Sequence, residues 1–194
     1  MRKVFKIILA IFAVLIIIVA AVGAVFFLDV SALTATSSQT LTPTGPSVGN
    51  AMVVYDPGLS GAAKGVADKI ASDLQTQGYT VQLAGIKSST ATHTTGYNTI
   101  GGFSIVVAGG PVYAGAVTSS VKDFLNNLKP DQGVKVGVFG SGSGSTTPED
   151  VAQIKDSVGA LKAGGLLANA VVVKIGSGED LSARTADLVS QLIR

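Results

Sequence analysis

One short segment constrains the fold of this chain more than any other: Ser104-Ile-Val-Val-Ala-Gly-Gly-Pro-Val-Tyr-Ala-Gly115. A β-branched apolar run ends abruptly at two glycines and a proline, presents a tyrosine, and is followed by an amphipathic pattern. A strand buried on both faces of a parallel sheet has this pattern. Because ligands in open α/β sheets bind outside the carboxyl ends of the strands, the segment predicts a fold class and the place of a site.

Strand and helix patterns alternate along residues 51–194, which we expect to form one domain. The expected strands are Ala51–Tyr55, Thr80–Ala84, Ser104–Ala108, Val134–Phe139 and Ala170–Ile175. The expected helices are Gly61–Gln77, Thr118–Leu128, Thr147–Leu161 and Glu179–Ile193, with at most a weak helix within residues 85–103. This alternation predicts an α/β fold with a parallel, doubly wound sheet.

The N-terminal part of the chain has a different composition. Residues 7–28 carry no polar side chain and follow a basic flank, residues 1–6. At about 1.5 Å per residue the apolar run is long enough to cross a bilayer core of about 30 Å. The positive-inside rule then predicts a single-pass membrane protein with a cytoplasmic N-terminus and an extracytoplasmic domain. Val30-Ser31-Ala32 resembles a small-residue cleavage site, so a cleaved leader is the alternative.

Residues 29–50 are rich in Ser, Thr, Pro and Gly. With few apolar residues to offset the entropy of ordering, they are expected to form an extended stalk between the membrane and the domain.

The chain has no cysteine, which excludes disulfides, thiol chemistry and Cys-ligated clusters. Its formal net charge is +2, and nothing in the charge pattern indicates nucleic-acid binding.

Three segments together resemble the flavodoxin family. They are Val53-Val-Tyr-Asp-Pro-Gly-Leu-Ser-Gly-Ala-Ala-Lys-Gly-Val-Ala-Asp-Lys-Ile-Ala71, Gly109-Gly-Pro-Val-Tyr-Ala-Gly115 and Val136-Gly-Val-Phe-Gly-Ser-Gly-Ser-Gly-Ser145. The resemblance extends over essentially all of residues 51–194. It implies a flavodoxin-like three-layer sandwich, with a five-stranded parallel sheet of order 2-1-3-4-5. It also implies a non-covalent FMN site at the ends of the first, third and fourth strands.

The resemblance places the FMN contacts in three loops. The first loop leads into a helix, whose free N–H groups and dipole suit a phosphate. The second loop presents Tyr113 for stacking on the flavin ring, and the third can line the ring edge with backbone N–H groups. The expected contacts are Gly58, Leu59, Ser60, Gly61, Ala62 and Ala63 in the first loop, Gly110, Pro111, Val112, Tyr113, Ala114 and Gly115 in the second, and Ser141, Gly142, Ser143 and Gly144 in the third.

The first loop departs from the family pattern, which usually reads Thr-Gly-Asn-Thr. Allowing one inserted residue, this chain has Ser60-Gly61-Ala62-Ala63 there, so a hydroxyl and an amide side chain are missing. Each lost hydrogen bond to a charged phosphate is worth about 1.5–3 kcal/mol. Asp56 adds a negative charge nearby.

Two functions follow from these observations. The first is a membrane-anchored carrier that binds FMN and exchanges electrons with an unknown redox partner protein. The alternative is a flavodoxin-fold binding or structural module without a cofactor on the extracytoplasmic face.

No catalytic residue or metal site is expected, since His93 is the only histidine and has no ligand-type partners at metal-site spacing. The Gly-x-Ser-x-Gly match at residues 45–49 precedes the first expected strand, whereas a nucleophile elbow follows a strand, and a P-loop and a dinucleotide fingerprint are missing from the sequence.

Overall fold

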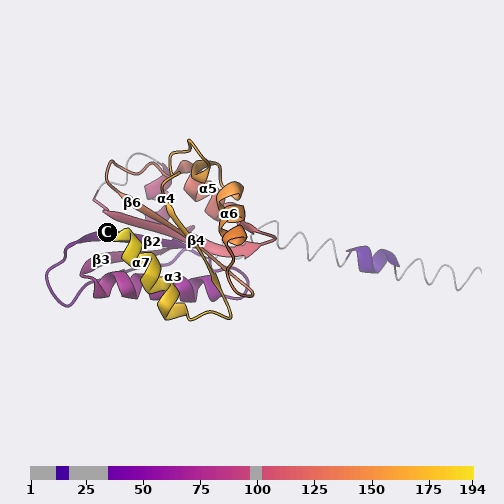
Figure 1. Cartoon of the computed structure of the whole chain (residues 1–194), viewed down its shortest axis with the longest axis horizontal. Coiled ribbons are helices and arrows are strands. Elements are labelled where there is room, and N and C mark those ends of the chain that lie inside the picture. The colour runs from indigo at the N-terminus through magenta and orange to yellow at the C-terminus, as the bar shows by residue number, and fades with distance from the viewer. Residues whose placement is uncertain (1–11, 18–34, 97–101) are drawn as a thin grey trace, which may run out of the picture.

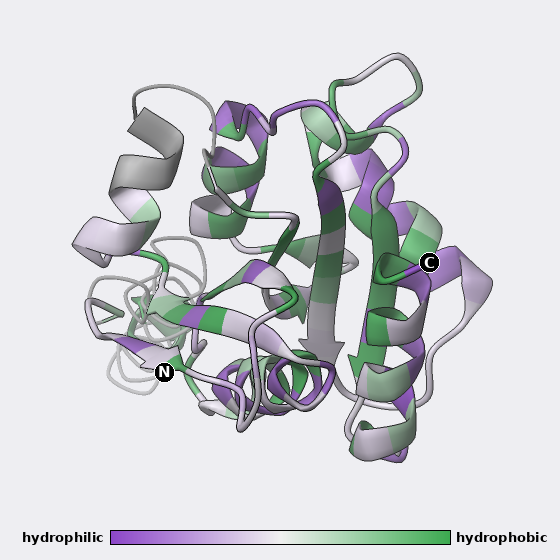
Figure 2. Cartoon of the chain, turned by 90° about the vertical axis from the view of Figure 1, so that its left-hand side faces the viewer, coloured by the Kyte–Doolittle hydropathy of each residue, from purple (hydrophilic) through white to green (hydrophobic). Residues whose placement is uncertain are grey.

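A computed structural model of the chain describes residues 12–17, 35–96 and 102–194. Residues 35–96 and 102–194 form a sheet covered by helices on both faces, which gives three layers (Figure 1). The central strands are hydrophobic over most of their length (Figure 2), because in a three-layer fold both faces of each strand are covered.

The sheet in the described part of the chain has seven strands in the order β1-β3-β2-β4-β6-β7, with β5 paired to β4 alone. The strands are β1 (Ser38–Leu41), β2 (Gly49–Tyr55), β3 (Tyr79–Gly85), β4 (Ile105–Tyr113), β5 (Ala116–Val117), β6 (Lys135–Gly142) and β7 (Val171–Gly176). Strands β3, β2, β4, β6 and β7 are parallel neighbours in this order, which is 2-1-3-4-5 when these five are numbered along the chain. The expected flavodoxin-like strand order is therefore confirmed.

The expectation of only five strands is wrong, because two short antiparallel strands join the sheet. Strand β5 folds back on the end of β4 as a hairpin, with Val112 opposite Val117. Strand β1 pairs with the edge strand β3, with Ser38 opposite Ala84 and Leu41 opposite Val81. Residues 38–41, expected to belong to an extended stalk, thus complete the sheet. They satisfy backbone groups of β3 that would otherwise form an open edge.

Five α-helices and one 3-10 turn cover the sheet in the described residues. They are α3 (Ala62–Thr76), α4 (Ser89–Gly96), α5 (Ser119–Asn127), α6 (Pro148–Ser157), η1 (Gly159–Leu161) and α7 (Leu181–Leu192). Helices α3 and α7 pack on one face, where Ile70 and Leu188 meet the strand residues Val53 and Val107. The buried residues of α4, α5 and α6 pack on the other face.

The local sequence explains where the helices begin. Helix α6 starts with a capping box, in which the Thr147 hydroxyl accepts from the Asp150 N–H and the Asp150 carboxylate accepts from the Thr147 N–H. Helix α7 starts after Asp180, whose carboxylate accepts from the N–H groups of Ser182 and Ala183. Both helix starts lie at the carboxyl edge of the sheet and fix the ends of the loops after β6 and β7.

The expected membrane span, residues 7–28, lies outside the described residues except for 12–17. Those six residues are helical, and the apolar side chains of Phe12, Leu15 and Ile17 are exposed. Among the residues described, no helix has the length and apolar character needed to cross a membrane.

Two glycines at the start of α3 provide a matched test of backbone conformation. A Cβ added at Gly61 or at Gly65 would meet nothing within 4 Å, but Gly61 has φ +72 whereas Gly65 lies in the helix. Gly65→Ala should raise the free energy of unfolding by about 0.5–1 kcal/mol, because alanine loses less backbone entropy in a helix. Gly61→Ala should lower it by about 1–2 kcal/mol, because an L-residue is strained in the left-handed region. Urea unfolding measures both, and equal effects of the two changes would contradict this account.

Candidate functional site

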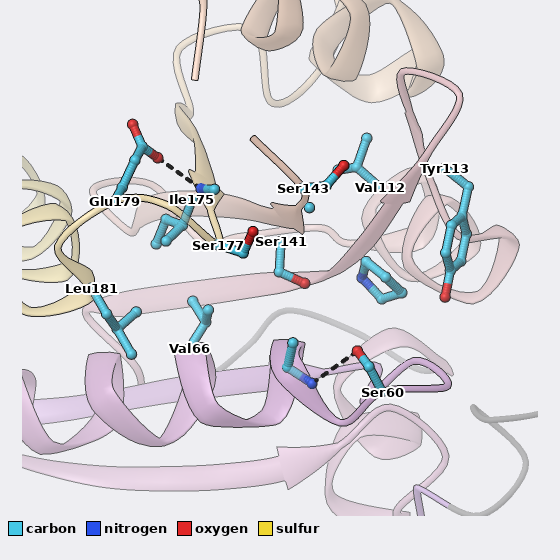
Figure 3. A pocket seen from close by; sticks show the side chains of 14 residues that line it. Ser60, Val66, Val112, Tyr113, Ser141, Ser143, Ile175, Ser177, Glu179 and Leu181 are labelled. Carbon is cyan, nitrogen blue, oxygen red and sulfur yellow. Dashed lines mark hydrogen bonds between the residues drawn. The ribbon is translucent and has the colours of Figure 1, made fainter. Parts of the chain in front are cut away.

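A cavity of about 640 Å³ opens at the carboxyl ends of β4, β6 and β7, beside the N-terminus of α3 (Figure 3). Fourteen described residues line it: Ser60, Ala62, Val66, Pro111, Val112, Tyr113, Ser141, Gly142, Ser143, Ile175, Gly176, Ser177, Glu179 and Leu181. In the view of Figure 3, Ser60 and Tyr113 lie at one end, and Glu179 and Leu181 lie at the other. This is the edge of the sheet where a doubly wound fold places its ligand.

The structure brings all three predicted loops to this cavity, although only half of the predicted residues line it. Those that do are Ser60, Ala62, Pro111, Val112, Tyr113, Ser141, Gly142 and Ser143. The others lie in the same loops but outside the lining: Gly58, Leu59, Gly61, Ala63, Gly110, Ala114, Gly115 and Gly144. Packing explains two of these, since Ala63 is buried in the core under α3 and Gly110 packs between Asp56 and Val121.

Sequence reasoning missed the contribution of the last strand. Ile175, Gly176, Ser177, Glu179 and Leu181 line the cavity from the end of β7 and the start of α7. The signal that could have found them is present in the sequence. A buried β-branched strand ends there in a Gly-Ser-Gly turn, which is the same pattern that pointed to the loop after β6.

The turn after β2 is organised by the buried carboxylate of Asp56. Its Oδ1 accepts a hydrogen bond from the Gly58 N–H at 3.0 Å, and its Oδ2 accepts one from the Thr118 hydroxyl at 2.7 Å. Gly58 has φ +64, and a Cβ there would lie 2.7 Å from Pro111 Cγ. The turn is therefore held against the loop after β4, and only glycine fits at the contact.

The start of α3 uses its own polar groups locally. The Ser60 hydroxyl oxygen accepts from the Ala62 N–H at 3.3 Å, and the Lys64 N–H donates to the Gly61 carbonyl. The Lys64 ammonium bonds both carboxylate oxygens of Asp68 at 2.8 and 3.0 Å, and this hydrogen bonding raises the pKa of Lys64. The cation nearest to the turn along the chain is thus paired on the outer surface of the helix.

The loop after β4 is a tight hairpin that presents Tyr113. Tyr113 pairs with Ala116 across a two-residue turn, in which Ala114 has φ 48 and Gly115 has φ 81. Two positive φ values in succession are typical of the type I′ turn that suits a β-hairpin. Because the hairpin fixes the backbone on both sides, the half-buried Tyr113 ring is held at the rim of the cavity.

The loop after β6 is supported by a partly buried ion pair beneath it. The Lys174 side chain passes alongside Gly142, and its ammonium lies 2.9 Å from Asp150 Oδ1. The hydrogen bond from Lys174, followed by those from Thr147, lowers the pKa of Asp150 to about 2. This pair joins β7 to the first turn of α6, so it holds the two ends of the Ser141–Gly144 loop region together.

Glu179 is the charged residue among the described lining residues. Its Oε2 accepts from the Gly176 N–H and the Thr146 hydroxyl, both at 2.7 Å, and its Oε1 lies 3.7 Å from Arg184 Nε. Burial alone would raise the pKa of Glu179, but the hydrogen bonds from Gly176 and Thr146 and the charge of Arg184 together hold it below its ordinary value. Glu179 therefore holds the turn after β7 through its carboxylate, which in Figure 3 points away from the other labelled lining side chains.

No protein-family model matches this chain, and no curated protein sequence matches it. Solved structures similar to the chain include a short-chain flavodoxin associated with a bacterial microcompartment, at 19% identity and a TM-score of 0.49 over 74% of this chain and 95% of that one. A flavodoxin from Streptococcus pneumonia TIGR4 is 18% identical with a TM-score of 0.49, over 74% of this chain and 97% of that one. A flavodoxin, WrbA-like protein from Agrobacterium tumefaciens is 16% identical with a TM-score of 0.45, over 75% and 98%. The assignment of a flavodoxin-like fold rests on the strand order described above.

The Lys174–Asp150 pair gives a pH-dependent prediction. Because the pKa of Asp150 is about 2 in the folded state, below its ordinary value of 3.8, its ionised form stabilises the fold. That contribution is complete above about pH 4 and is lost as the pH falls through about 2. The difference in unfolding free energy between the parent and Asp150→Asn should therefore shrink between pH 4 and pH 2. Lys174→Met should weaken this pH dependence, and parallel loss of stability in parent and Asp150→Asn would refute the assignment.

Proposed function

We propose that the cavity binds the isoalloxazine ring of a flavin and that the protein serves as an electron-transfer module. The observation that carries this proposal is the position of the cavity. It lies at the carboxyl edge of a 2-1-3-4-5 sheet, where the loops after β2 and β4 meet, and this is the switch point at which such sheets bind flavin. A volume of about 640 Å³ is in the range of pockets that enclose a cofactor.

The walls of the cavity suit a planar ring with polar edges. Val66, Val112, Ile175 and Leu181 provide apolar contacts, and Tyr113 can stack against a ring at the rim. The serine hydroxyls and the backbone of the loops after β6 and β7 can bond the polar ring edge. A flavin bound there would supply the one- and two-electron chemistry, while these residues would bind it, orient it and exclude water.

The fit is weaker for the phosphate of FMN, the cofactor expected from the family resemblance. At the turn before α3, Ser60 is the lining residue that carries a side-chain hydroxyl. Ala62 and Ala63 have no side-chain hydrogen-bond donor. The Gly58 N–H already donates to Asp56. This arrangement also supports the second candidate function, a binding or structural module that holds no cofactor.

Flavin titration of the purified full chain tests the proposal. Riboflavin or FMN should lose fluorescence on binding with a dissociation constant in the micromolar range or below. Tyr113→Ala should weaken binding about 2- to 10-fold, because an aromatic contact contributes about 0.5–1.5 kcal/mol. Gly65→Ala, on the surface of α3 and outside the lining, serves as the control. No quenching by either flavin in a folded sample would favour the module without a cofactor.

We also propose that residues 7–28 anchor the chain in a membrane with the domain on the extracytoplasmic side. The support is the length of the apolar run and its basic flank. Protease added to intact cells should then degrade the domain or release it by cutting between the anchor and β1. Full protection of the domain, with the protease shown to be active on a known surface protein, would contradict this topology.

A further inference from the structure

We propose that the cavity selects a flavin without a phosphate group, so that riboflavin binds at least as tightly as FMN. This inference rests on the proposed flavin-binding function and specifies the chemical class of the ligand. FMN carries about −1.5 to −2 charges on its phosphate at neutral pH, whereas the ribityl chain of riboflavin ends in an uncharged hydroxyl. The charges and donors around the cavity decide between the two.

The first observation is the charge of the lining. Of the fourteen described residues that line the cavity, none is a lysine, arginine or histidine, and Glu179 is a carboxylate. Its carboxylate is bound by Gly176 and Thr146 at the opposite end of the cavity from Ser60, so it offers no positive charge to a phosphate at the α3 N-terminus. A phosphate entering this cavity would leave water without meeting a cation among these fourteen residues, which is unfavourable for a charged group.

The second observation is that the cations close to the site are engaged elsewhere. Lys64 bonds both carboxylate oxygens of Asp68 on the outer surface of α3. Arg184 donates to the Lys174 carbonyl at 3.0 Å and lies beside Glu179. Neither side chain lines the cavity, so a phosphate could recruit one only by breaking an existing ion pair.

The third observation is that the turn before α3 already binds a carboxyl group of the chain itself. Asp56 is fully buried beneath the turn, and its carboxylate takes the Gly58 N–H that could otherwise turn toward a phosphate. The Thr118 hydroxyl holds the other oxygen, so the carboxylate is fixed in place. The Gly58 N–H is therefore already engaged and is not directed toward a phosphate at this turn.

The uncharged end of riboflavin fits the same surroundings. The hydroxyl groups of Ser60, Ser143 and Ser177 line the cavity and can both donate to and accept from ribityl hydroxyls. Such neutral hydrogen bonds need no cation. Each charge-assisted bond that the site cannot make to a phosphate removes about 10- to 100-fold in affinity for FMN.

The test is a parallel fluorescence titration of the purified full chain, in mild detergent, with riboflavin and with FMN. The expected result is a dissociation constant for riboflavin equal to that for FMN within about threefold, or lower. FMN binding at least tenfold tighter than riboflavin would overturn the inference while leaving the flavin function intact. Failure of both flavins to bind a folded sample would overturn the proposed function as well.

A matched pair of variants tests the physical cause. Ala62 is exposed at the first turn of α3 and lines the cavity, so Ala62→Lys adds a cation where a phosphate would lie, and Ala62→Gln adds similar bulk without charge. The affinity ratio of FMN to riboflavin should be about tenfold or more higher in Ala62→Lys than in Ala62→Gln. Equal ratios in the two variants would show that charge at this turn does not control selection, which would overturn the inference.

Discussion

The hydrogen bonds of the Asp56 carboxylate are the interaction on which the geometry of the candidate site depends. One oxygen closes the turn after β2 through Gly58, and the other holds Thr118 at the start of α5, a helix on the opposite face of the sheet from α3. The carboxylate therefore joins elements of both outer layers at the switch point. Because the carboxyl group is fully buried, removing either partner would cost it a hydrogen bond that water cannot easily replace, which is unfavourable.

The same arrangement explains why the loops after β2 and β4 meet at one place. Gly58 packs directly on Pro111, and a side chain at Gly58 would collide with that ring. The β4–β5 hairpin then extends from Pro111 and carries Tyr113 to the rim of the cavity. Asp56 and Gly58, two positions apart in the turn after β2, thus help to set the position of Tyr113 on another loop.

The sequence predicted the parts of this architecture that depend on local pattern. Buried β-branched runs and amphipathic helices identified the five parallel strands, because each element shows its own period, whereas their order was implied by the resemblance to the flavodoxin family. Strand β1 was missed because Ser38–Leu41 is polar and short, and its stability comes from pairing with β3 rather than from its own composition. Helix α4 was weakly predicted for the same reason, as its segment has almost no amphipathic pattern.

The electrostatic character of the site could not be obtained from the sequence in the same way. The sequence shows Lys64 close to the first loop, but only the structure shows that its ammonium pairs with Asp68. The sequence marks the turn in which Glu179 lies, but it does not show that Gly176 and Thr146 bind the Glu179 carboxylate. Charge selection in a cleft depends on where each charge is held and by which partners, and these are properties of the folded arrangement. A flavodoxin-like strand order is therefore compatible with a cavity that prefers a flavin without a phosphate group. The core sets the strand order, whereas a few fixed polar groups at the sheet edge set the ligand preference.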